Sequence, residues 1–210
     1  MDGTLGAGGH ARAILERADG RVTLVGIDRD GMALELARGV LAEAAAQCRL
    51  VRGNFAEVAS LVRGLGIAAV DGLVLDLGMS SMQVDDAARG FSFLRDGPLD
   101  MRMDRDRGET AAELVNRLEE RELADLLWRY GEERDARRIA RALVAERRRS
   151  PFRSTGQLAA SIERVKGGRR SGIHPATRSF QALRIAVNGE LAALAAGLEG
   201  GIGLLKTGGR

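Results

Sequence analysis

Apolar and polar positions follow two periods along the chain, and each period predicts a different kind of element. Short apolar runs predict buried strands at 22–28, at Leu50-Val51 and at 70–76. Runs with helical spacing predict helices over residues 11–17, 33–46, 57–65, 119–130, 134–149, 155–165 and 174–198. Strands and helices therefore alternate in the first part of the chain, and the remainder is predicted to be mostly helical.

This alternation predicts an α/β fold with a parallel, doubly wound sheet, because apolar strands joined by helices are covered on both faces. Ligands of such sheets bind beyond the carboxyl ends of the strands. Four segments of the sequence reach that edge, namely the glycine-rich residues 2–10, Asp28, Phe55 and Asp76. Their convergence predicts a ligand site at this edge.

The glycine-rich stretch Asp2-Gly-Thr-Leu-Gly-Ala-Gly-Gly-His10 opens the first predicted helix. Glycines let backbone approach a ligand closely, and a helix N-terminus offers free N–H groups. Asp28 follows Gly8 by 20 residues, close to the ~20-residue offset at which a carboxylate reaches ribose hydroxyls. The stretch also fits the loose dinucleotide pattern G-x-G-x-x-A, so these residues leave open a nicotinamide or another nucleoside cofactor. Phe55 either stacks on the base of that cofactor or belongs to the hydrophobic core.

Residues 77–104 have little periodicity and many polar and glycine positions. Long irregular segments of compact domains are usually functional or disordered. Interleaved aromatic and methionine side chains favour an ordered active-site loop here, and these are Phe91, Phe93, Met101 and Met103. The next helix begins with Thr110 and Glu113 at the spacing of a capping box.

Composition narrows the class of protein. A chain of 210 residues suits one domain with an insertion or two small domains. Cys48 is the only cysteine, which excludes a disulfide framework and a zinc cluster. His10 and His174 lack partners at ligand spacing, so no metal site is expected, and His174 before Pro175 is interpreted as a turn or capping residue. Neither a signal peptide nor a membrane-spanning run is visible, which predicts a cytoplasmic location.

Charge is distributed unevenly. The segment from Arg105 to Arg178 has 18 Lys or Arg and 12 Asp or Glu, a net charge of +6, and the remainder has a net charge of −3. A basic central segment in an otherwise neutral-to-acidic chain suggests that one part binds nucleic acid and another binds a cofactor. The predicted basic helix supplies the candidate contacts Arg134, Arg137, Arg138 and Arg141, and a solvated helix face is the alternative interpretation. Residues 166–172 are expected to form a flexible basic loop.

Nine motifs together resemble the bacterial 16S rRNA (cytosine-N4)-methyltransferase family, whose members use S-adenosylmethionine to methylate the exocyclic amine of a cytosine. The motifs are residues 2–10, Gly26-Ile-Asp-Arg-Asp, Gly53-Asn-Phe, Leu75-Asp-Leu-Gly-Met-Ser-Ser-Met-Gln, Arg89-Gly-Phe-Ser-Phe, Asp96-Gly-Pro-Leu-Asp-Met-Arg-Met-Asp, Tyr130-Gly-Glu-Glu-Arg, Ala136-Arg-Arg-Ile-Ala-Arg-Ala and His174-Pro-Ala-Thr-Arg-Ser-Phe-Gln-Ala-Leu-Arg-Ile-Ala-Val-Asn. The resemblance covers essentially the whole chain, and the motifs that begin at Asp96 and His174 are highly specific.

The resemblance implies an α/β fold of class I, with an incomplete Rossmann-like methyltransferase sheet and an inserted all-helical domain. Residues 1–104 and 176–210 would form the S-adenosylmethionine-binding domain, and residues 105–175 would form the insertion that recognises RNA. It implies cofactor contacts at Gly8, Gly9, His10, Asp28, Phe55, Asp76 and Gln83. In this interpretation the glycine turn approaches the methionine end of the cofactor, Asp28 the ribose and Phe55 the adenine.

The function implied is methylation of the exocyclic N4 amine of a cytidine in the decoding region of 16S rRNA, with 16S rRNA or the small ribosomal subunit as partner and no membrane. The motifs identify no catalytic residue. Asp76 and the backbone carbonyls of Leu77 and Gly78 are the candidates to accept a hydrogen bond from the amine. The alternatives are a non-catalytic RNA-binding fragment and an NAD-binding oxidoreductase. The oligomeric state is open, with a homodimer as one option.

The chain departs from the family pattern at a few positions. Met79 and Met82 stand where the family usually has Val and Pro, and Gly189 where it usually has Arg or another polar residue. The lead-in of the first strand before Asp2 and the strands expected after Gly209 are absent from this sequence. We therefore expect a sheet of three good strands and a stub, with an exposed apolar edge.

Overall fold

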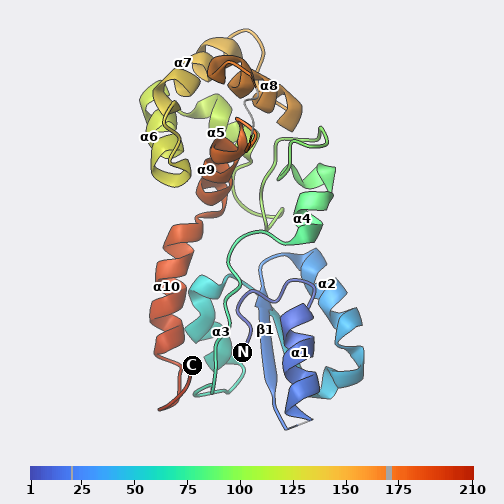
Figure 1. Cartoon of the computed structure of the whole chain (residues 1–210). Helices are drawn as coiled ribbons and strands as arrows, with labels where there is room; N and C mark the ends of the chain where they lie inside the picture. Colours follow the sequence, from blue (N-terminus) through green and yellow to red (C-terminus); the bar gives the residue numbers. More distant parts are fainter. Residues whose placement is uncertain (20, 169–171) are drawn as a thin grey trace. The chain divides into compact units, whose positions relative to one another are not determined.

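The computed structural model describes residues 1–19, 21–168 and 172–210, and the chain divides into two compact units (Figure 1). The sheet unit comprises Met1–Gly78 and Glu190–Arg210, and the helical unit comprises Met79–Gly189. Each unit has its own hydrophobic core. The basic loop expected at 166–172 lies in part, at 169–171, outside the described residues.

The sheet unit is built on two parallel strands, β1 (Leu24–Asp28) and β2 (Cys48–Arg52). Short segments extend this sheet through isolated bridges. Residues 1–3 lie between β1 and residue 74, with the Asp2 N–H donating to the Val25 carbonyl at 2.8 Å and the Gly3 N–H to the Val74 carbonyl at 2.9 Å. Residues 205–210 lie beside residues 70–73. In chain numbering the five segments are ordered 3-2-1-4-5, the order of doubly wound sheets.

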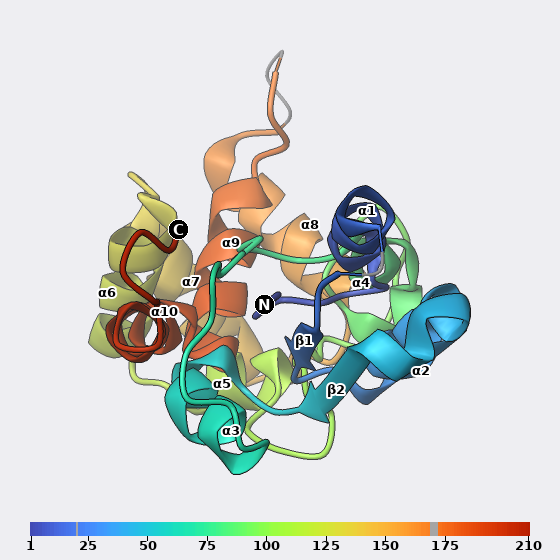
Figure 2. The same cartoon turned by 90° about the horizontal axis from the view of Figure 1, so that it is seen from below.

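Both faces of β1 are covered, which explains its nearly continuous apolar sequence. Leu24 packs with α1 (Gly9–Ala18) and α2 (Gly31–Val40). Val25 and Ile27 point to the other face and pack with α3 (Val58–Gly64). Figures 1 and 2 show α1 and α3 on opposite sides of β1. The predicted parallel α/β sheet is confirmed in this reduced form.

The third predicted strand, at 70–76, forms only two isolated bridges, Val70 with Leu205 and Val74 with Asp2. Backbone hydrogen bonds link it to both neighbours, through Val74 with Met1 and Gly3 on one side and through Val70 and Leu73 with residues 204–210 on the other, but they do not form a continuous strand. The predicted helix at 33–46 is also shorter. It ends as α2 at Val40 and continues as the 3-10 segment η1 (Ala42–Gln47).

The single long final helix predicted for 174–198 is wrong. Two helices occupy this region, α9 (Thr177–Asn188) and α10 (Glu190–Ile202). Gly189 separates them with a φ of 58°, in the left-handed region that ends helices. Because glycine lacks a Cβ, it adopts this conformation at little steric cost.

The helical unit contains a series of short helices around one core. They are α4 (Ser81–Asp85), η3 (Ala87–Arg89), α5 (Ala111–Arg117), α6 (Glu120–Gly131), α7 (Ala136–Arg147), α8 (Thr155–Lys166) and α9. The capping box predicted for Thr110 and Glu113 is confirmed at α5, and Ser154 with Gln157 forms another at α8. No helix among the described residues has the length and apolar content needed to cross a membrane.

Residues 77–104, predicted as one irregular but ordered loop, contain the short helices α4 and η3, and residues 90–104 are held by buried polar contacts. The active-site role of this loop stays a prediction. The Asn188 side chain accepts from the Met103 N–H at 2.8 Å and donates to the Met101 carbonyl at 2.8 Å. Burial acts to raise the pKa of Asp100, but hydrogen bonds from Arg102 hold that pKa below its usual range. These contacts make the loop and α9 part of the helical unit. The chain therefore divides at 78/79 and 189/190, whereas the sequence suggested boundaries at 104/105 and 175/176.

Candidate functional site

Asp28 connects the end of β1 to the glycine-rich turn. Its Oδ2 accepts from the Gly6 N–H at 2.7 Å, and its Oδ1 accepts from the Asp30 N–H at 2.8 Å. Burial raises the pKa of Asp28, and the two backbone donors partly offset that effect. A carboxylate has about four lone-pair sites, so each oxygen retains capacity for a further donor such as a ribose hydroxyl.

The glycine turn presents bare backbone at the start of α1. Gly8 has a φ of 88°, and a Cβ built on it would lie 3.4 Å from the Cβ of Ala37. A Cβ on Gly6 or Gly9 would meet no atom within 4 Å. Gly8 gives α1 no side-chain cap, so the N–H groups of the first turn of this helix have no intrahelical acceptors. This arrangement suits a polar or anionic ligand group.

His10 and Asp76 lie close together at the same edge of the sheet unit. The His10 Nδ1 is 3.9 Å from the Asp76 Oδ2, and both side chains are exposed. The Asp76 N–H donates to the Thr4 Oγ1 at 2.6 Å, which ties the fourth sheet segment to the glycine-rich stretch. The predicted residues Gly8, Gly9, His10, Asp28 and Asp76 therefore belong to one neighbourhood of the sheet unit.

Asp2 is a candidate that the sequence analysis did not select. Its side chain is fully buried, its Oδ1 accepts from the Thr4 N–H at 3.1 Å, and its Oδ2 has no hydrogen-bond partner among the described residues. Burial raises the pKa of Asp2, and the charge of Asp28 adds to this effect. A buried acceptor without a donor is costly, which makes this oxygen a candidate polar contact for a ligand. Its position before the glycines was the available signal.

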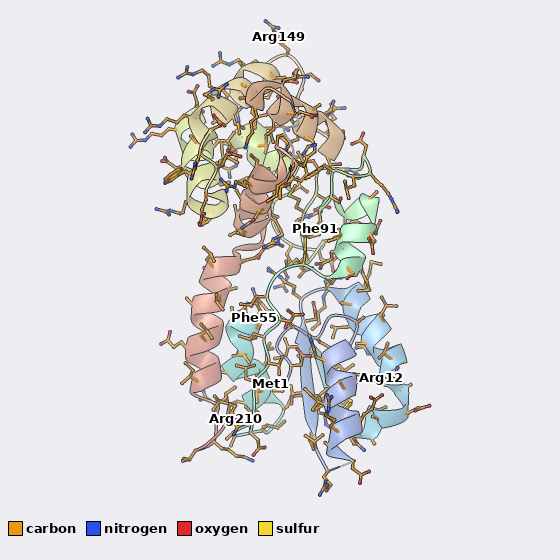
Figure 3. The ribbon with its side chains drawn as sticks, in the orientation of Figure 1. Met1, Arg12, Phe55, Phe91, Arg149 and Arg210 are labelled. Carbon is orange, nitrogen blue, oxygen red and sulfur yellow. The ribbon has the colours of Figure 1, made fainter. Side chains whose placement is uncertain are left out.

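Phe55 begins the short segment η2 (Phe55–Glu57) and packs against α10 (Figure 3). A Cβ on Gly197 would lie 2.4 Å from the Phe55 Cδ2, so this edge of the ring rests on the backbone of α10. Gln83 belongs to the helical unit. Its Oε1 accepts from the Ser80 N–H at 3.1 Å in the capping box of α4. The cofactor contacts expected of Phe55 and Gln83 stay predictions.

The four candidate arginines are exposed, but they differ in their partners. Arg138 binds the Asp135 carboxylate at 2.8 Å and the Val165 carbonyl at 2.9 Å, and Arg141 is 3.5 Å from Glu120. Arg137 has no ion-pair partner among the described residues. The same is true of Arg134, which lies in the turn before α7 and not on the helix as predicted.

A sheet of this order, with a glycine turn and carboxylates at its carboxyl edge, defines an α/β protein of the doubly wound class. The profile of the MraW methylase family matches residues 1–210, so the chain belongs to that family. Among curated proteins, it is 52% identical over 210 residues to a ribosomal RNA small subunit methyltransferase H of Methylocella silvestris and 54% identical over 213 residues to that of Methylobacterium nodulans. All of this chain is matched, against 60% and 62% of these relatives, so the chain spans about three fifths of their length.

Proposed function

We propose that this chain binds S-adenosylmethionine at the carboxyl edge of the sheet unit and serves in methylation of the exocyclic N4 amine of a cytidine in 16S rRNA. The observation that carries the proposal is the bond from the Gly6 N–H to the Asp28 carboxylate, which joins the glycine turn to a ribose-binding position. Family membership supports methyl transfer, and the names of the relatives support small-subunit rRNA as the substrate.

The donor set at this edge fits the groups of S-adenosylmethionine. The Asp28 carboxylate would accept from the ribose hydroxyls, and the uncapped first turn of α1 would bind the methionine carboxylate. The buried Asp2 Oδ2 is the natural acceptor for the ammonium group, because a charged donor would relieve its unpaired state. Phe55 would border the adenine, and the contact that the family resemblance implies for Gln83 stays an expectation.

When bound, the cofactor supplies an electrophilic methyl group on a sulfonium centre. Transfer of that group to the amine would form the N–C bond, break the C–S bond and release one proton from the amine to solvent, with Asp28 and the first turn of α1 holding the cofactor. The amine is a weak nucleophile because its lone pair is delocalised into the ring. An acceptor that bonds its N–H localises that pair, and Asp76 or the carbonyls of Leu77 and Gly78 are the candidates. The protein would mainly align the amine with the methyl group.

We assign RNA recognition to the helical unit. It contains 22 Lys or Arg and 17 Asp or Glu, whereas the sheet unit has 10 and 12. Arg134 and Arg137 would be the strongest phosphate contacts among the four candidates, because neither has a carboxylate partner among the described residues. A target base in the ribosomal subunit must also leave its stack to reach the methyl donor.

Calorimetry with S-adenosylmethionine and with NAD tests the cofactor assignment. We expect saturable binding of the first and none of the second, and the reverse would make the chain a nucleotide-binding oxidoreductase. Methyl incorporation from labelled cofactor into assembled small subunits then tests the activity, with a full-length relative as positive control. RNA binding without incorporation would identify a non-catalytic RNA-binding fragment.

A further inference from the structure

Two segments of the helical unit meet in a surface that the proposed function does not yet use. The rings of Phe93 and His174 stack with centroids 4.4 Å apart and planes inclined by 31°. Leu94 follows Phe93 and is 84% exposed, and Ile173 precedes His174 and is 78% exposed. We call Phe93, Leu94, Ile173 and His174 the aromatic patch.

Contacts with α9 and with the residue before it hold the two rings of the aromatic patch in place. Phe93 contacts the buried Phe180 of α9 edge to face, with centroids 4.8 Å apart. The His174 Nδ1 accepts from the Ala176 N–H at 3.2 Å, which agrees with the turn role predicted for His174, whereas α9 has no side-chain cap at its N-cap residue Ala176. With Nδ1 as acceptor, the neutral imidazole carries its proton on Nε2. The ring pair is therefore held in place and retains one N–H donor beyond its structural role.

The exposure of the patch has no explanation in the core of the helical unit. Leu94 and Ile173 are more exposed than any other large apolar side chain in the described part of the chain, and they flank the same ring pair. A protein gains no stability from such side chains in water. Planar rings bordered by apolar groups and one N–H donor are instead the means by which proteins hold unpaired nucleobases.

Charge next to the patch favours a polyanion. Arg95 follows Leu94 and is exposed. The neighbouring carboxylate of Asp96 is engaged at the start of α8, where it accepts from the Gly156 N–H at 2.7 Å. The helical unit as a whole has a net charge of +5. Asp96 keeps its negative charge, so the attraction for a phosphate backbone on this side comes from the exposed Arg95 and from the net charge of the unit.

We propose that the aromatic patch binds an unpaired base of the RNA, by stacking on the His174–Phe93 ring pair and by a hydrogen bond from the His174 Nε2. This inference rests on the proposed function, since it takes RNA as the partner of the helical unit. It adds a specific recognition surface and a preference for single-stranded over duplex RNA, because bases in a duplex are already stacked and hidden.

The test compares binding of a fluorescein-labelled single-stranded RNA and of its duplex to the 210-residue chain and two variants. His174→Asn keeps an acceptor for the Ala176 N–H but removes the ring and the Nε2 donor. Phe93→Leu keeps apolar packing on Phe180 but removes the other ring. We expect each to raise the Kd for the single strand by about tenfold, the usual scale for loss of one stacked base, and to change the duplex Kd by less than about twofold.

Ile202→Ser on α10 is the matched control, because Ile202 is an exposed aliphatic side chain of the sheet unit. It should leave both affinities unchanged. Thermal unfolding followed by fluorescence of Trp128, the only tryptophan, verifies that the variants keep the helical unit folded. The chain has two histidines, so the His174 ring resonance can be assigned by its loss in His174→Asn and should shift on adding the single strand.

Three outcomes would overturn the inference. Folded variants with wild-type affinity for the single strand would remove the patch from RNA binding and leave the proposed function standing. Equal weakening for single strand and duplex would indicate phosphate contact without base stacking. Wild-type protein that binds neither RNA would instead reject the RNA partner, and with it the proposed function.

Discussion

Adjacent glycines in the cofactor turn have different physical roles. Gly8 requires glycine for its own conformation, since its φ of 88° lies in the left-handed region that side chains rarely adopt. Gly9 is the first residue of α1, and a Cβ there would face open space. One position therefore serves the fold, and the other leaves room for a ligand.

Alanine substitutions should separate these roles. Gly8→Ala places a side chain in the left-handed region and should cost about 1–2 kcal/mol of unfolding free energy. Gly9→Ala improves helix propensity and should leave stability unchanged or raise it by up to about 1 kcal/mol, while weakening S-adenosylmethionine binding. Urea denaturation and calorimetry measure the two effects. Equal loss of stability in both variants would contradict the distinction.

Burial of the Asp2 carboxyl should make the folding stability of the chain depend on pH. Burial raises the pKa of Asp2 in the folded chain above its ordinary value of 3.8. The folded state then binds this proton more tightly than the unfolded state, so stability falls as pH rises from about 4 through the raised pKa. Asp2→Asn retains an acceptor for the Thr4 N–H but does not titrate. Without ligand, the variant should gain thermal stability relative to wild type as pH rises to neutrality, and it should bind S-adenosylmethionine more weakly.

The control for Asp2→Asn is Asp71→Asn, because Asp71 is exposed and its pKa is lowered, chiefly by its hydrogen bond with Lys206. Its effect should have the opposite sign, a small loss of relative stability that is complete above about pH 4 and disappears as pH falls through the lowered pKa. A flat pH profile for the difference between wild type and Asp2→Asn would show that the buried carboxyl does not titrate differently on folding.

Functional residues could be predicted from the sequence where their distance along the chain from a motif identifies them. Asp28 was selected by its offset from Gly8, and its contact with the glycine turn agrees with that choice. Asp2 was missed because the pattern shows a polar residue but not that its side chain is buried with an unpaired oxygen. Pairing is equally invisible in sequence, so Arg138 and Arg137 looked alike although only Arg138 has a carboxylate partner.

At the scale of elements, a buried ion pair joins the turn after α6 to the end of α8. Lys166 Nζ lies 2.9 and 2.7 Å from the two carboxylate oxygens of Glu133, whose side chain is 1% exposed. Lys166→Met would leave this carboxylate buried without its partner and should cost about 3–5 kcal/mol. The double variant Glu133→Gln with Lys166→Met should lose less, because it removes the buried charge as well.

The matched control is Lys206→Met, which breaks the exposed pair with Asp71. Exposed pairs contribute about 0–1 kcal/mol, so this change should be nearly silent. Chemical denaturation followed by Trp128 fluorescence and by circular dichroism measures the series. A cost for Lys166→Met as small as that of the control would mean that water reaches Glu133 when the lysine is lost.

We expect Arg134 and Arg137 to contribute more to RNA binding than Arg138 and Arg141. Replacing Arg134 and Arg137 with Gln removes unpaired cations and should reduce the slope of log affinity against log salt by about 1.4, at ~0.7 per single-strand phosphate contact. Replacing Arg138 and Arg141 should reduce it by less than half as much, because each already has a carboxylate partner. Equal slopes for the two double variants would exclude pairing as the deciding factor.

Most helices were predictable from periodicity because their caps are local. Thr110 and Glu113 fixed the start of α5, and Ser154 fixed that of α8. The break between α9 and α10 was missed because Gly189 lies inside a run with good helical spacing, where a single glycine is tolerated. The segment 70–76 was predicted as a full strand because its apolar pattern does not reveal that its backbone pairing is discontinuous.

At the scale of the whole chain, the two units have separate cores and separate reporters. Trp128 lies in the helical unit, whereas Gly8, Asp28 and Asp76, which we propose as cofactor contacts, lie in the sheet unit. A ligand that binds one folded unit stabilises that unit by about 2.7 kcal/mol at a hundred times its Kd. If each core unfolds as its own cooperative unit, the ligand should raise one transition alone.

S-adenosylmethionine should therefore raise the midpoint of the transition that circular dichroism assigns to the sheet unit by several degrees and leave that of Trp128 within about 1 °C. Asp28→Asn provides the control, because loss of a ribose acceptor should abolish the shift without moving the Trp128 midpoint. Single-stranded RNA should give the opposite pattern, raising the Trp128 transition through the helical unit. If either ligand moved both transitions together, the two cores would share one cooperative unfolding step, and cofactor binding would be coupled to RNA binding through the fold.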